Sequence, residues 1–489
     1  MTASTPVDKS AEVPVCVDLD GTLIHTDLLF ESFLLLLRQN FIAALQVPFW
    51  LLLKGKAETK LRIAALVAVQ AEHLPYCEPV IAYVRAQREQ GRRTVLATAS
   101  AQRYAQAVAD HTGLFDDVIA TATSDTNLSG ANKAQALAQR FPAGFEYIGN
   151  SSDDLPVWQQ AQRVSIANAK PRVRDAAHQL GRTAFQTDNP FNPLRAAIKG
   201  IRLHQWLKNL LVFLPVLAGH RVADTAVLTQ ALLAFLAFGL CASSVYLLND
   251  LLDIEVDRRH PRKRLRPFAA GALSIPLGGA LTVLLLAGAV LVSLALPAAF
   301  GAVLLMYYLL TLSYSLRLKA QVMVDVMMLS ALYTVRLLAG SAATGITLSF
   351  WLLAFSMFLF LSLALLKRYG EMRMLARSDQ RRSAGRGYST DDIVVLLALG
   401  SASGYSAALV LALYVNSADV ARLYTHPQVL WAAIPMLVYW LSRIWLKSHR
   451  GEVHDDPVVF AARDWQSLVI IGLLLGLGLM ASYTGPLLP

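Results

Sequence analysis

Residues 249–267 read NDLLDIEVDRRHPRKRLRP, and they close a long apolar run. Within them Asn249, Asp253 and Asp257 recur at every fourth position, so on a helix they drift around the surface by only about 40° per step. Asp250 lies beside Asp253 on that surface. Basic side chains follow directly at Arg258, Arg259, Arg262, Lys263, Arg264 and Arg266. The pattern predicts a helix that leaves a membrane with an amide and three carboxylates on one face.

This combination of charges is typical of a site for a metal-bound phosphate. Carboxylates in register are what Mg²⁺ requires, and Mg²⁺ usually brings substrate phosphates with it. Arginines supply matching donors for phosphate oxygens. The alternative is a basic loop that only orients a membrane protein, with acids that only end a helix. We favour the site because acids in register at a membrane boundary are costly to keep.

The composition indicates two halves of different kind. The chain has 489 residues, of which 55% are hydrophobic and 16% charged, and its apolar runs lie mainly after about residue 210. This distribution predicts a soluble domain followed by a domain of many membrane helices. The net charge is +10. Most basic residues of the second half lie in short loops, which indicates membrane orientation and an anionic substrate rather than nucleic-acid binding.

The N-terminus and the cysteines indicate that the soluble half stays in the cytoplasm. Residues 1–12 are polar, so we expect them to be disordered and to hold no cleavable signal peptide. Cys16, Cys77 and Cys241 show neither metal nor disulfide spacing, which fits a reducing compartment.

Four short motifs stand in order in the first half. The β-type run Val13–Val17 leads directly into Asp18 and Asp20. Acids at the C-terminal end of a strand, followed by Gly, are typical of the active edge of a doubly wound α/β sheet. Alone, the two acids would fit turn or helix-capping roles equally well. In chain order the motifs are DLDGTL at 18–23, Thr98 after a strand-like run, Lys133 after a turn, and GNSSDD at 149–154.

This order of motifs resembles the haloacid dehalogenase-like phosphatases. The resemblance implies that Asp18 is the nucleophile, which forms an aspartyl-phosphate, and that Asp20 is the general acid/base. It implies that Thr98 and Lys133 hold the phosphoryl oxygens. For Mg²⁺ it implies the ligands Asp18, Asp20, Asp153 and Asp154.

The predicted phosphatase domain covers residues 13–185 and carries an insertion at about 28–90. Residues 33–53 of the insertion are unusually apolar, but a membrane-spanning helix there would separate the first two motifs. We therefore expect a helical cap, which either is buried in the domain core or contacts the membrane surface or a lipid substrate. Ser100 is expected to cap the following helix. Residues 186–194 have turn chemistry and are the predicted linker.

Residues 195–489 form the predicted membrane domain, an all-α polytopic bundle. Basic residues cluster in alternate connections, which places the N-terminus and the phosphatase domain in the cytoplasm and the C-terminus outside. We expect a multi-pass protein of the inner, cytoplasmic membrane with about nine helices. The apolar runs begin near Lys208, Val227, Ile275, Pro297, Gln321, Ser349, Ile393, Val429 and Trp465.

The acids of residues 249–257 close the second of these runs and resemble the first Asp-rich motif of the UbiA superfamily of prenyltransferases. The resemblance implies a diphosphate bound through Mg²⁺ beneath a lipid-accessible cavity. Most members carry a second Asp-rich motif three helices later. Here the matching region is 314–319 followed by Asp325, with Leu329 where a second acid would stand. This departure counts against two-site binding of an isoprenoid diphosphate.

Several stretches resemble one branch of that superfamily, the decaprenyl-phosphate phosphoribosyltransferases. They are RLHQWLKN at 202–209, residues 250–267, GRGYS at 385–389, and residues 455–460 with Asp464. The branch transfers phosphoribose from phosphoribosyl pyrophosphate to a polyprenyl phosphate. A donor with a diphosphate and a separate 5-phosphate accounts for the many arginines.

This second resemblance implies a set of site residues. Asn249, Asp250, Asp253 and Asp257 would hold Mg²⁺ on the donor, with Asp250 and Asp253 as catalytic residues. Substrate contacts are implied at Lys208, Asn249, Arg258, Lys263, Arg266, Tyr314, Lys319, Asp325 and Arg336. For Arg336 the alternative is a structural partner such as Asp325 or a helix-end carbonyl. Asp456 and Asp464 either join the site or cap helices.

Together these motifs predict an enzyme of lipid glycosylation with two active sites. The membrane domain would make a polyprenyl-phosphate phosphoribose, and the phosphatase would remove the 5-phosphate. One alternative is an aromatic prenyltransferase that uses a polyprenyl diphosphate. Another is a non-catalytic membrane scaffold whose phosphatase alone is active. The expected partners are the lipid bilayer, polyprenyl phosphate and phosphoribosyl pyrophosphate (or polyprenyl diphosphate), with no nucleic acid and an open oligomeric state.

Overall fold

The computed structural model describes residues 13–124, 127–181, 183–377, 381, 386–453 and 456–482. The predicted disorder of residues 1–12 and the motif positions Gly385 and Asp455 lie outside these ranges. The chain forms two compact units. Unit 1 comprises Met1–Ile201 and Leu247–Leu281, and unit 2 comprises Arg202–Tyr246 and Thr282–Pro489.

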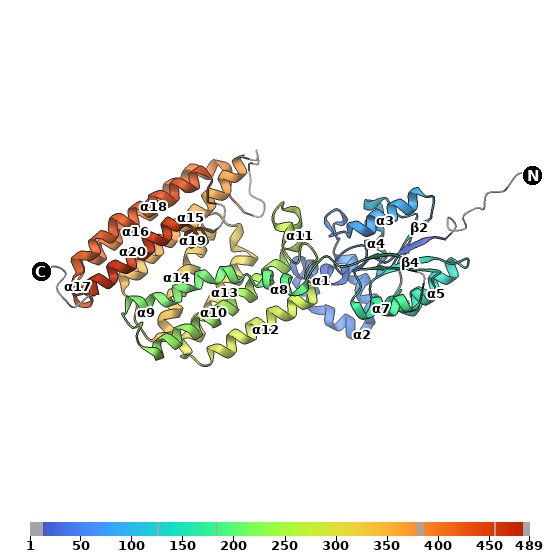
Figure 1. Ribbon diagram of the computed structural model, residues 1–489, viewed down its shortest axis with the longest axis horizontal. Helices are drawn as coiled ribbons and strands as arrows, with labels where there is room; N and C mark the ends of the chain where they lie inside the picture. Colours follow the sequence, from blue (N-terminus) through green and yellow to red (C-terminus); the bar gives the residue numbers. More distant parts are fainter. Residues whose placement is uncertain are drawn as a thin grey trace, which may run out of the picture. The chain divides into compact units, whose positions relative to one another are not determined.

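A parallel sheet of six strands in the order β3-β2-β1-β4-β5-β6 forms the centre of unit 1 (Figure 1). Val17, the last residue of β1, pairs with Leu96 of β2 and Ile148 of β4. The three strands therefore deliver their following residues to one edge of the sheet. The strands are β1 (Val15–Val17), β2 (Thr94–Ala101), β3 (Asp117–Thr121), β4 (Glu146–Gly149), β5 (Arg163–Ala167) and β6 (Thr183–Thr187).

Helices cover both faces of this sheet, because alternate residues of each strand point to opposite sides. On one face Val15 and Val17 pack with residues of α3 and α4. On the other, Cys16 and Val95 pack with residues of α5, α6 and α7. Figure 1 shows α3 and α4 on one side and α5 and α7 on the other. The helices are α3 (Glu78–Glu89), α4 (Gln102–Thr112), α5 (Gly130–Arg140), α6 (Leu155–Gln160) and α7 (Pro171–Gln179). The predicted doubly wound α/β fold is confirmed.

Between β1 and β2 the chain is helical, as expected of a cap. Asp27 begins α1 (Leu28–Gln39) by accepting a hydrogen bond from the backbone of Leu29. The next helix, α2 (Phe41–Leu66), is kinked at Gly55, whose φ of +78° a residue with a side chain rarely adopts. The short helix η2 (Ala71–His73) then leads to α3.

Unit 1 also contains the acidic and basic stretch around residue 250. The long helix α10 (Thr225–Leu252) ends there, and α11 (Ile254–Arg259) and η5 (Lys263–Leu265) follow. The unit ends within α12 (Ile275–Ser293).

Unit 2 is helical. The described residues contain eight helices long and apolar enough to span a membrane, one fewer than the sequence predicted. The run near Lys208 is instead η4 (Leu203–Phe213) and the short α9 (Leu214–Ala218), because Pro215 begins a new helix and buried Lys208 and Asn209 interrupt the apolar face. The spans are α10, α12, α13 (Ala298–Leu316), α14 (Val324–Thr344), α15 (Phe350–Arg377), α16 (Ile393–Val415), α18 (Ala433–Arg450) and α20 (Trp465–Ser482).

Shorter helices complete the chain. Three of them lie within, or directly after, predicted site residues or motifs. These three are η6 (Leu318–Ala320), η7 (Thr390–Asp392) and α19 (Pro457–Ala461). The others are η3 (Ser152–Asp154), α8 (Pro193–Ile201), α17 (Ala418–Leu423) and η8 (Pro427–Ala432).

Candidate functional site

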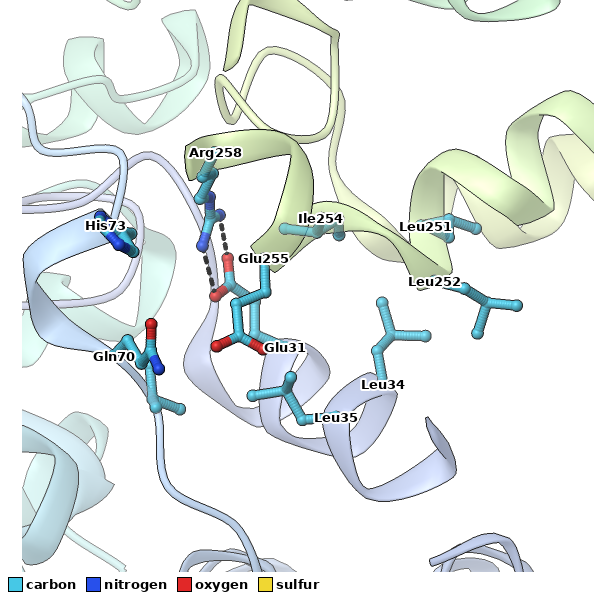
Figure 2. A pocket seen from close by; sticks show the side chains of 11 residues that line it. Glu31, Leu34, Leu35, Gln70, His73, Leu251, Leu252, Ile254, Glu255 and Arg258 are labelled. Atoms are coloured by element: carbon cyan, nitrogen blue, oxygen red, sulfur yellow. Dashed lines mark hydrogen bonds and ion pairs between the residues drawn. The ribbon is translucent and has the colours of Figure 1, made fainter. Parts of the chain in front are cut away.

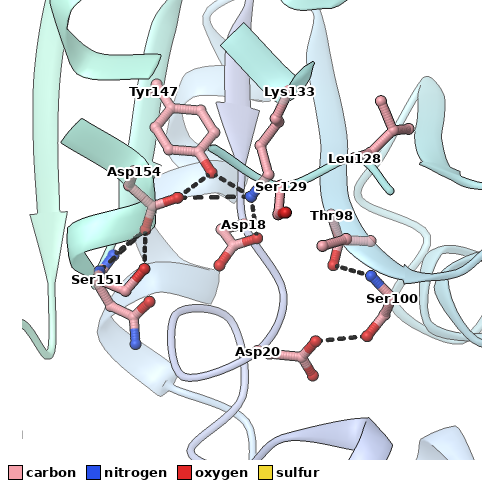
Figure 3. A network of polar contacts seen from close by, with 12 residues as sticks. Asp18, Asp20, Thr98, Ser100, Leu128, Ser129, Lys133, Tyr147, Ser151 and Asp154 are labelled. Atoms are coloured by element: carbon pink, nitrogen blue, oxygen red, sulfur yellow. Dashed lines mark hydrogen bonds and ion pairs between the residues drawn. The ribbon is translucent and has the colours of Figure 1, made fainter. Parts of the chain in front are cut away.

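The carboxylate of Asp18 lies in a chain of polar contacts directly after β1. Lys133 Nζ of α5 lies 2.7 Å from Asp18 Oδ1 and 2.7 Å from the hydroxyl of Tyr147 (Figure 3). That hydroxyl donates to Asp154 Oδ1 at 2.7 Å. The structure therefore brings the first, third and fourth sequence motifs together, through a tyrosine that the sequence analysis did not identify.

The two acids of the GNSSDD motif have different surroundings. Asp154 is buried, and its Oδ2 accepts from the backbone of Asn150 and Ser151 at 2.9 and 3.0 Å. Asp153 is exposed. Asp154 therefore supports the turn and faces Lys133, while Asp153 remains a predicted ligand.

Asp20 lies beside the second motif. Its Oδ2 accepts from the Ser100 hydroxyl at 2.5 Å, and its Oδ1 accepts from the backbone of Leu28 at 2.9 Å. Thr98 Oγ1 in turn accepts from the backbone of Ser100 at 3.1 Å. The expectation that Ser100 caps a helix was wrong, because β2 continues to Ala101 and that residue is the cap of α4.

Burial tunes the two catalytic candidates. For Asp18, burial raises the pKa to about 6, although the adjacent Lys133 ammonium opposes the rise. For Asp20, burial and the nearby charge of Asp27 raise the pKa to about 7, while the hydrogen bond from Ser100 lowers it. A carboxyl that keeps its proton near neutral pH can act as an acid, and one beside an ammonium can be ionised for attack.

Gly21 is required by the tight turn that directly follows Asp20. Its φ is +76°, and a Cβ atom there would lie 2.1 Å from Asn150 Nδ2. The turn therefore brings the backbone against the fourth motif at a distance that only glycine permits.

Lys60, on α2, reaches the same edge of the sheet. Its Nζ donates to the carbonyl of Ala99, between Thr98 and Ser100, at 2.7 Å. Burial lowers the pKa of Lys60, whereas the charges of Asp20 and Asp27 raise it. No sequence pattern pointed to Lys60, since one lysine in a helix of mixed character has no distinctive spacing.

The predicted transferase acids keep their helical register across the break between α10 and α11. The backbone of Asp253 donates to Asn249 at 2.9 Å, and the backbone of Asp257 donates to Asp253 at 2.8 Å. Arg266 connects two of the acids, because its Nη1 lies 3.0 Å from Asp250 and 2.7 Å from Asp257. The face therefore consists of an amide and three carboxylates, with one guanidinium across it.

Arg258, predicted as a substrate contact, is occupied within unit 1. Its Nη1 donates to Glu31 Oε2 of α1 at 2.9 Å, its Nη2 donates to Glu31 Oε1, and its Nε donates to the carbonyl of Ala269 at 3.0 Å (Figure 2). The neighbouring Lys263 lies in η5. Arg258 thus serves first to connect α11 with the cap helix α1.

In unit 2, the Asp456 carboxylate contacts two lysines and a tyrosine. Its Oδ2 lies 2.8 Å from Lys208 Nζ and 3.2 Å from Lys367 Nζ, and its Oδ1 accepts from the Tyr333 hydroxyl at 2.8 Å. Burial raises the pKa of Asp456, but the two ammonium groups outweigh it and hold the pKa well below its usual range. The residue also accepts from the backbone of Val458 at the start of α19, so its helix-capping role is confirmed, while its place in the substrate site stays a prediction.

Arg336 is buried at 4% exposure among neutral groups. Its Nε donates to Asn209 Oδ1 at 3.0 Å, its Nη2 donates to the Tyr307 hydroxyl at 3.3 Å, and its guanidinium lies 5.2 Å from the centre of the Tyr307 ring. Among the described residues, the Asn209 amide nitrogen finds no hydrogen-bond partner. Asp325 is therefore not the partner of Arg336.

Asp325 instead forms a buried ion pair with Arg368 of α15, and its Oδ1 accepts from the Tyr388 hydroxyl at 2.6 Å. Arg368 Nη2 also lies 3.3 Å from the hydroxyl of Tyr314. These contacts connect three regions that the sequence analysis singled out separately. Lys319 lies nearby in the chain, in the half-buried helix η6.

Across the described ranges, no three His, Cys, Asp or Glu side chains form a cluster that could hold a metal ion. Mg²⁺ is nevertheless commonly held by one or two carboxylates together with waters and substrate phosphates. In the domain that carries the β1 acids, Asp18 is buried with a raised pKa, and a cation would compensate its charge. The residues present therefore fit Mg²⁺ once a phosphate contributes ligands.

Comparison with known families identifies the membrane half. The family model described as the UbiA prenyltransferase family matches residues 212–468, more than half of the chain. The chain belongs to the UbiA prenyltransferase family. Residues 15–159 match the model described as haloacid dehalogenase-like hydrolase. The protein is thus a UbiA-superfamily membrane transferase with a haloacid dehalogenase-like hydrolase domain.

Relatives of this UbiA-family chain differ in how much of it they match. The uncharacterized protein y4nM of Sinorhizobium fredii is 36% identical over 96% of this chain and 91% of its own length. The decaprenyl-phosphate phosphoribosyltransferase of Mycobacterium tuberculosis is 38% identical over 39% of this chain and 65% of its own length. A solved UbiA homolog from Archaeoglobus fulgidus, bound to GPP and Mg²⁺, covers 58% of this chain and 99% of its own at 16% identity, with a TM-score of 0.45.

Proposed function

We propose that the UbiA half transfers 5-phosphoribose from phosphoribosyl pyrophosphate to a polyprenyl phosphate. The observation that carries the proposal is the surroundings of Arg336. Its buried guanidinium has an amide, a phenol and aromatic rings around it, and no ion pair with a carboxylate is found among the described residues. A buried cation without a counter-ion is costly, and the phosphate of a lipid acceptor would supply the missing charge.

The acidic face supports the donor side of the proposal. Asn249, Asp250, Asp253 and Asp257 have the oxygen ligands that Mg²⁺ prefers, and Mg²⁺ would neutralise the diphosphate leaving group. Arg266 lies against two of these acids and is positioned to exchange them for phosphate oxygens. The identity with the mycobacterial phosphoribosyltransferase adds support, because it is a protein named for this transfer.

The transfer needs no covalent intermediate. An oxygen of the polyprenyl phosphate attacks the anomeric carbon of the donor, the bond from that carbon to the diphosphate breaks, and inorganic diphosphate leaves with the electron pair. The protein's contribution is to position the two anions and to neutralise their charges. Arg336, with Lys208 and Lys367 nearby on Asp456, would serve the acceptor.

The hydrolase domain would then remove the 5-phosphate. Asp18 attacks phosphorus, and Asp20 gives its proton to the leaving 5-oxygen of the ribose. A water, deprotonated by Asp20, then releases phosphate from the aspartyl-phosphate. Lys133 and Thr98 would contact the phosphoryl oxygens. The product is a polyprenyl-phosphate pentose, and joining both steps in one chain raises the local concentration of the intermediate.

The test is incubation of reconstituted protein with labelled phosphoribosyl pyrophosphate, polyprenyl phosphate and Mg²⁺, followed by organic extraction and mass spectrometry. Wild type should give a lipid pentose, Asp18→Asn a lipid pentose phosphate, and Asp253→Asn no labelled lipid. Asp188→Asn, which changes an exposed acid of unit 1, is the matched control and should behave as wild type.

Transfer of a polyprenyl group to an aromatic acceptor is the second candidate, since the matched family model is that of prenyltransferases. The engagement of Asp325 by Arg368 and Tyr388 counts against it, because a second diphosphate-metal site would need that carboxylate. Absence of pentose from every extracted lipid, together with turnover of a labelled polyprenyl diphosphate, would replace the first proposal by this one.

A further inference from the structure

The first half of α2 is apolar on nearly all sides, with Gln46 as its one polar side chain. Residues 41–53 read FIAALQVPFWLLL and contain no charged side chain. One side packs within unit 1, where Ala44 is buried and Val47 and Trp50 are partly buried against residues of α1. A helix that is apolar all round is normally enclosed on all sides. The first half of α2 is enclosed on only one side.

The opposite side is open. Its six large apolar side chains that are more than half exposed fall within an arc of roughly 120° when placed on a helix, so they form one continuous face. The exposed fractions are 60% for Phe41, 73% for Ile42, 56% for Leu45, 64% for Phe49, 82% for Leu52 and 78% for Leu53. Burial of the cap in the domain core, one of the two alternatives from the sequence, is therefore wrong for this face.

The length and the flanking charges of the segment indicate what covers this face. Residues 41–53 make about 20 Å of helix, too short to cross a bilayer of about 30 Å but suited to lying in its surface. Arg38 before the segment and Lys54 and Lys56 after it are exposed. Basic residues at both ends of an apolar helix face complement anionic lipid headgroups.

We propose that residues 41–53 of α2 form a membrane seat, which lies in the surface of an anionic bilayer. Unit 1 already contains the end of α10 and the start of α12, both membrane spans. Insertion of the seat would remove six large apolar side chains from water, which is favourable in proportion to the apolar surface that is buried. The seat goes beyond the proposed transfer reaction and does not depend on it.

The seat is also connected to the hydrolase site. Beyond the kink at Gly55 the same helix carries Lys60, whose ammonium donates to the carbonyl of Ala99 beside Thr98. One helix therefore has an apolar half for lipid and a cationic half at the phosphate-binding edge. A phosphate attached to a membrane lipid fits this arrangement better than a phosphate free in solution.

The test places an environment-sensitive nitrobenzoxadiazole dye on an engineered cysteine of the full chain. Cys16, Cys77 and Cys241 are buried, so labelling is directed to Leu52→Cys, and Leu180→Cys, at an exposed apolar position after α7, is the matched control. The proteins are reconstituted in vesicles of phosphatidylcholine and phosphatidylglycerol with or without brominated acyl chains. We expect blue-shifted emission that brominated lipid quenches at position 52 and not at position 180.

Equal, water-like emission at both positions would overturn the seat. So would blue-shifted emission at position 52 that brominated lipid does not quench, because it would indicate a protein contact. As a second readout, Phe49→Ser with Leu52→Ser should lose most hydrolysis of a phosphorylated lipid in vesicles but retain hydrolysis of soluble p-nitrophenyl phosphate. Equal loss or equal retention of both activities would count against a role of the seat in lipid hydrolysis.

Discussion

Arg258 and Glu31 form a two-point ion pair with side chains that are only 7% and 5% exposed. Arg258 follows Asp257, one of the acids proposed to hold Mg²⁺ on the donor, and Glu31 lies in the cap helix α1 of the hydrolase domain. Glu31, Arg258 and Gln70 also line one pocket of unit 1 (Figure 2). The pair therefore connects the segment that carries the proposed transferase acids with the hydrolase domain.

Replacing Glu31 alone should be strongly destabilising. Glu31→Leu leaves a buried guanidinium without its carboxylate, at a cost of about 3–5 kcal/mol, whereas Glu31→Leu with Arg258→Met should recover most of the loss. The measurement is thermal unfolding in detergent. Unfolding is detected by the reaction of a thiol dye with Cys16 and Cys77, which are buried in the folded protein.

The exposed pair Arg174–Asp188 is the control for this experiment. Its atoms lie 3.0 Å apart with side chains 31% and 66% exposed, and Asp188→Asn should cost about 0–1 kcal/mol. A double variant as unstable as Glu31→Leu alone would mean that the carboxylate acts through groups other than Arg258.

The pH dependence of the hydrolase should respond to Ser100. The proposed mechanism requires ionised Asp18 and protonated Asp20, and burial raises their pKa values to about 6 and about 7. Hydrolase activity should therefore fall below about pH 6 and above about pH 7. The Ser100 hydroxyl stabilises the ionised form of Asp20. Ser100→Ala should therefore raise that pKa and move the alkaline limb to higher pH.

The profile is measured with p-nitrophenyl phosphate at saturating Mg²⁺, with Thr112→Ala at the distant end of α4 as the control. A shift of the alkaline limb to lower pH in Ser100→Ala would show that Asp20 is not the group that titrates there.

Lys60 should contribute to phosphate binding more than to turnover. Lys60→Met removes one charged donor next to Thr98, and since such a hydrogen bond is worth about 1.5 kcal/mol, KM for a soluble phosphomonoester should rise roughly tenfold while kcat changes little. Lys170→Met, at an exposed lysine before α7, should leave both constants unchanged. A loss confined to kcat would instead assign Lys60 to the chemical step.

Substitutions at Asp325 and Asp253 should distinguish an acid that stabilises the fold from an acid that acts in transfer. Asp325 and Arg368 are fully buried against each other, so Asp325→Asn should lower stability by about 3–5 kcal/mol yet leave transfer activity per folded molecule within a few-fold at low temperature. Asp253→Asn should instead leave the stability nearly unchanged and abolish the transfer activity. The reaction of buried Cys241 with a thiol dye reports unfolding of this half. Intact stability with lost transfer in Asp325→Asn would return Asp325 to the substrate site.

Local motifs allowed the α/β hydrolase fold and the UbiA-like helical half to be predicted, because strand ends, turns and apolar runs are written in neighbouring residues. The partners of the charges were harder to predict. Arg258 was predicted to contact substrate, but in the structure it pairs with Glu31. Asp325 was one alternative partner for Arg336, but in the structure Asn209 and aromatic rings surround Arg336. Such contacts join distant parts of the chain and leave no periodic pattern.

Tyr147 shows a second limit of the sequence. Its place in a short buried strand predicts packing, and its hydroxyl nevertheless bridges Lys133 and Asp154. Asp456 was identified as a weaker candidate, and only the structure brings Lys208, Lys367 and Tyr333 to it.

Unit 1 is discontinuous in the chain, and this has a consequence for biosynthesis. Glu31 precedes its partner Arg258 by 227 residues, and residues 202–246, which include most of α10, are made in between. The hydrolase domain emerges from the ribosome first, but its cap helix then holds a carboxylate whose counter-charge has not been synthesised. The hydrolase domain can therefore be completed only after α10 has been made and Arg258, in the stretch that follows it, has paired with Glu31. Folding of the hydrolase domain is thus coupled in time to membrane insertion of the transferase helices.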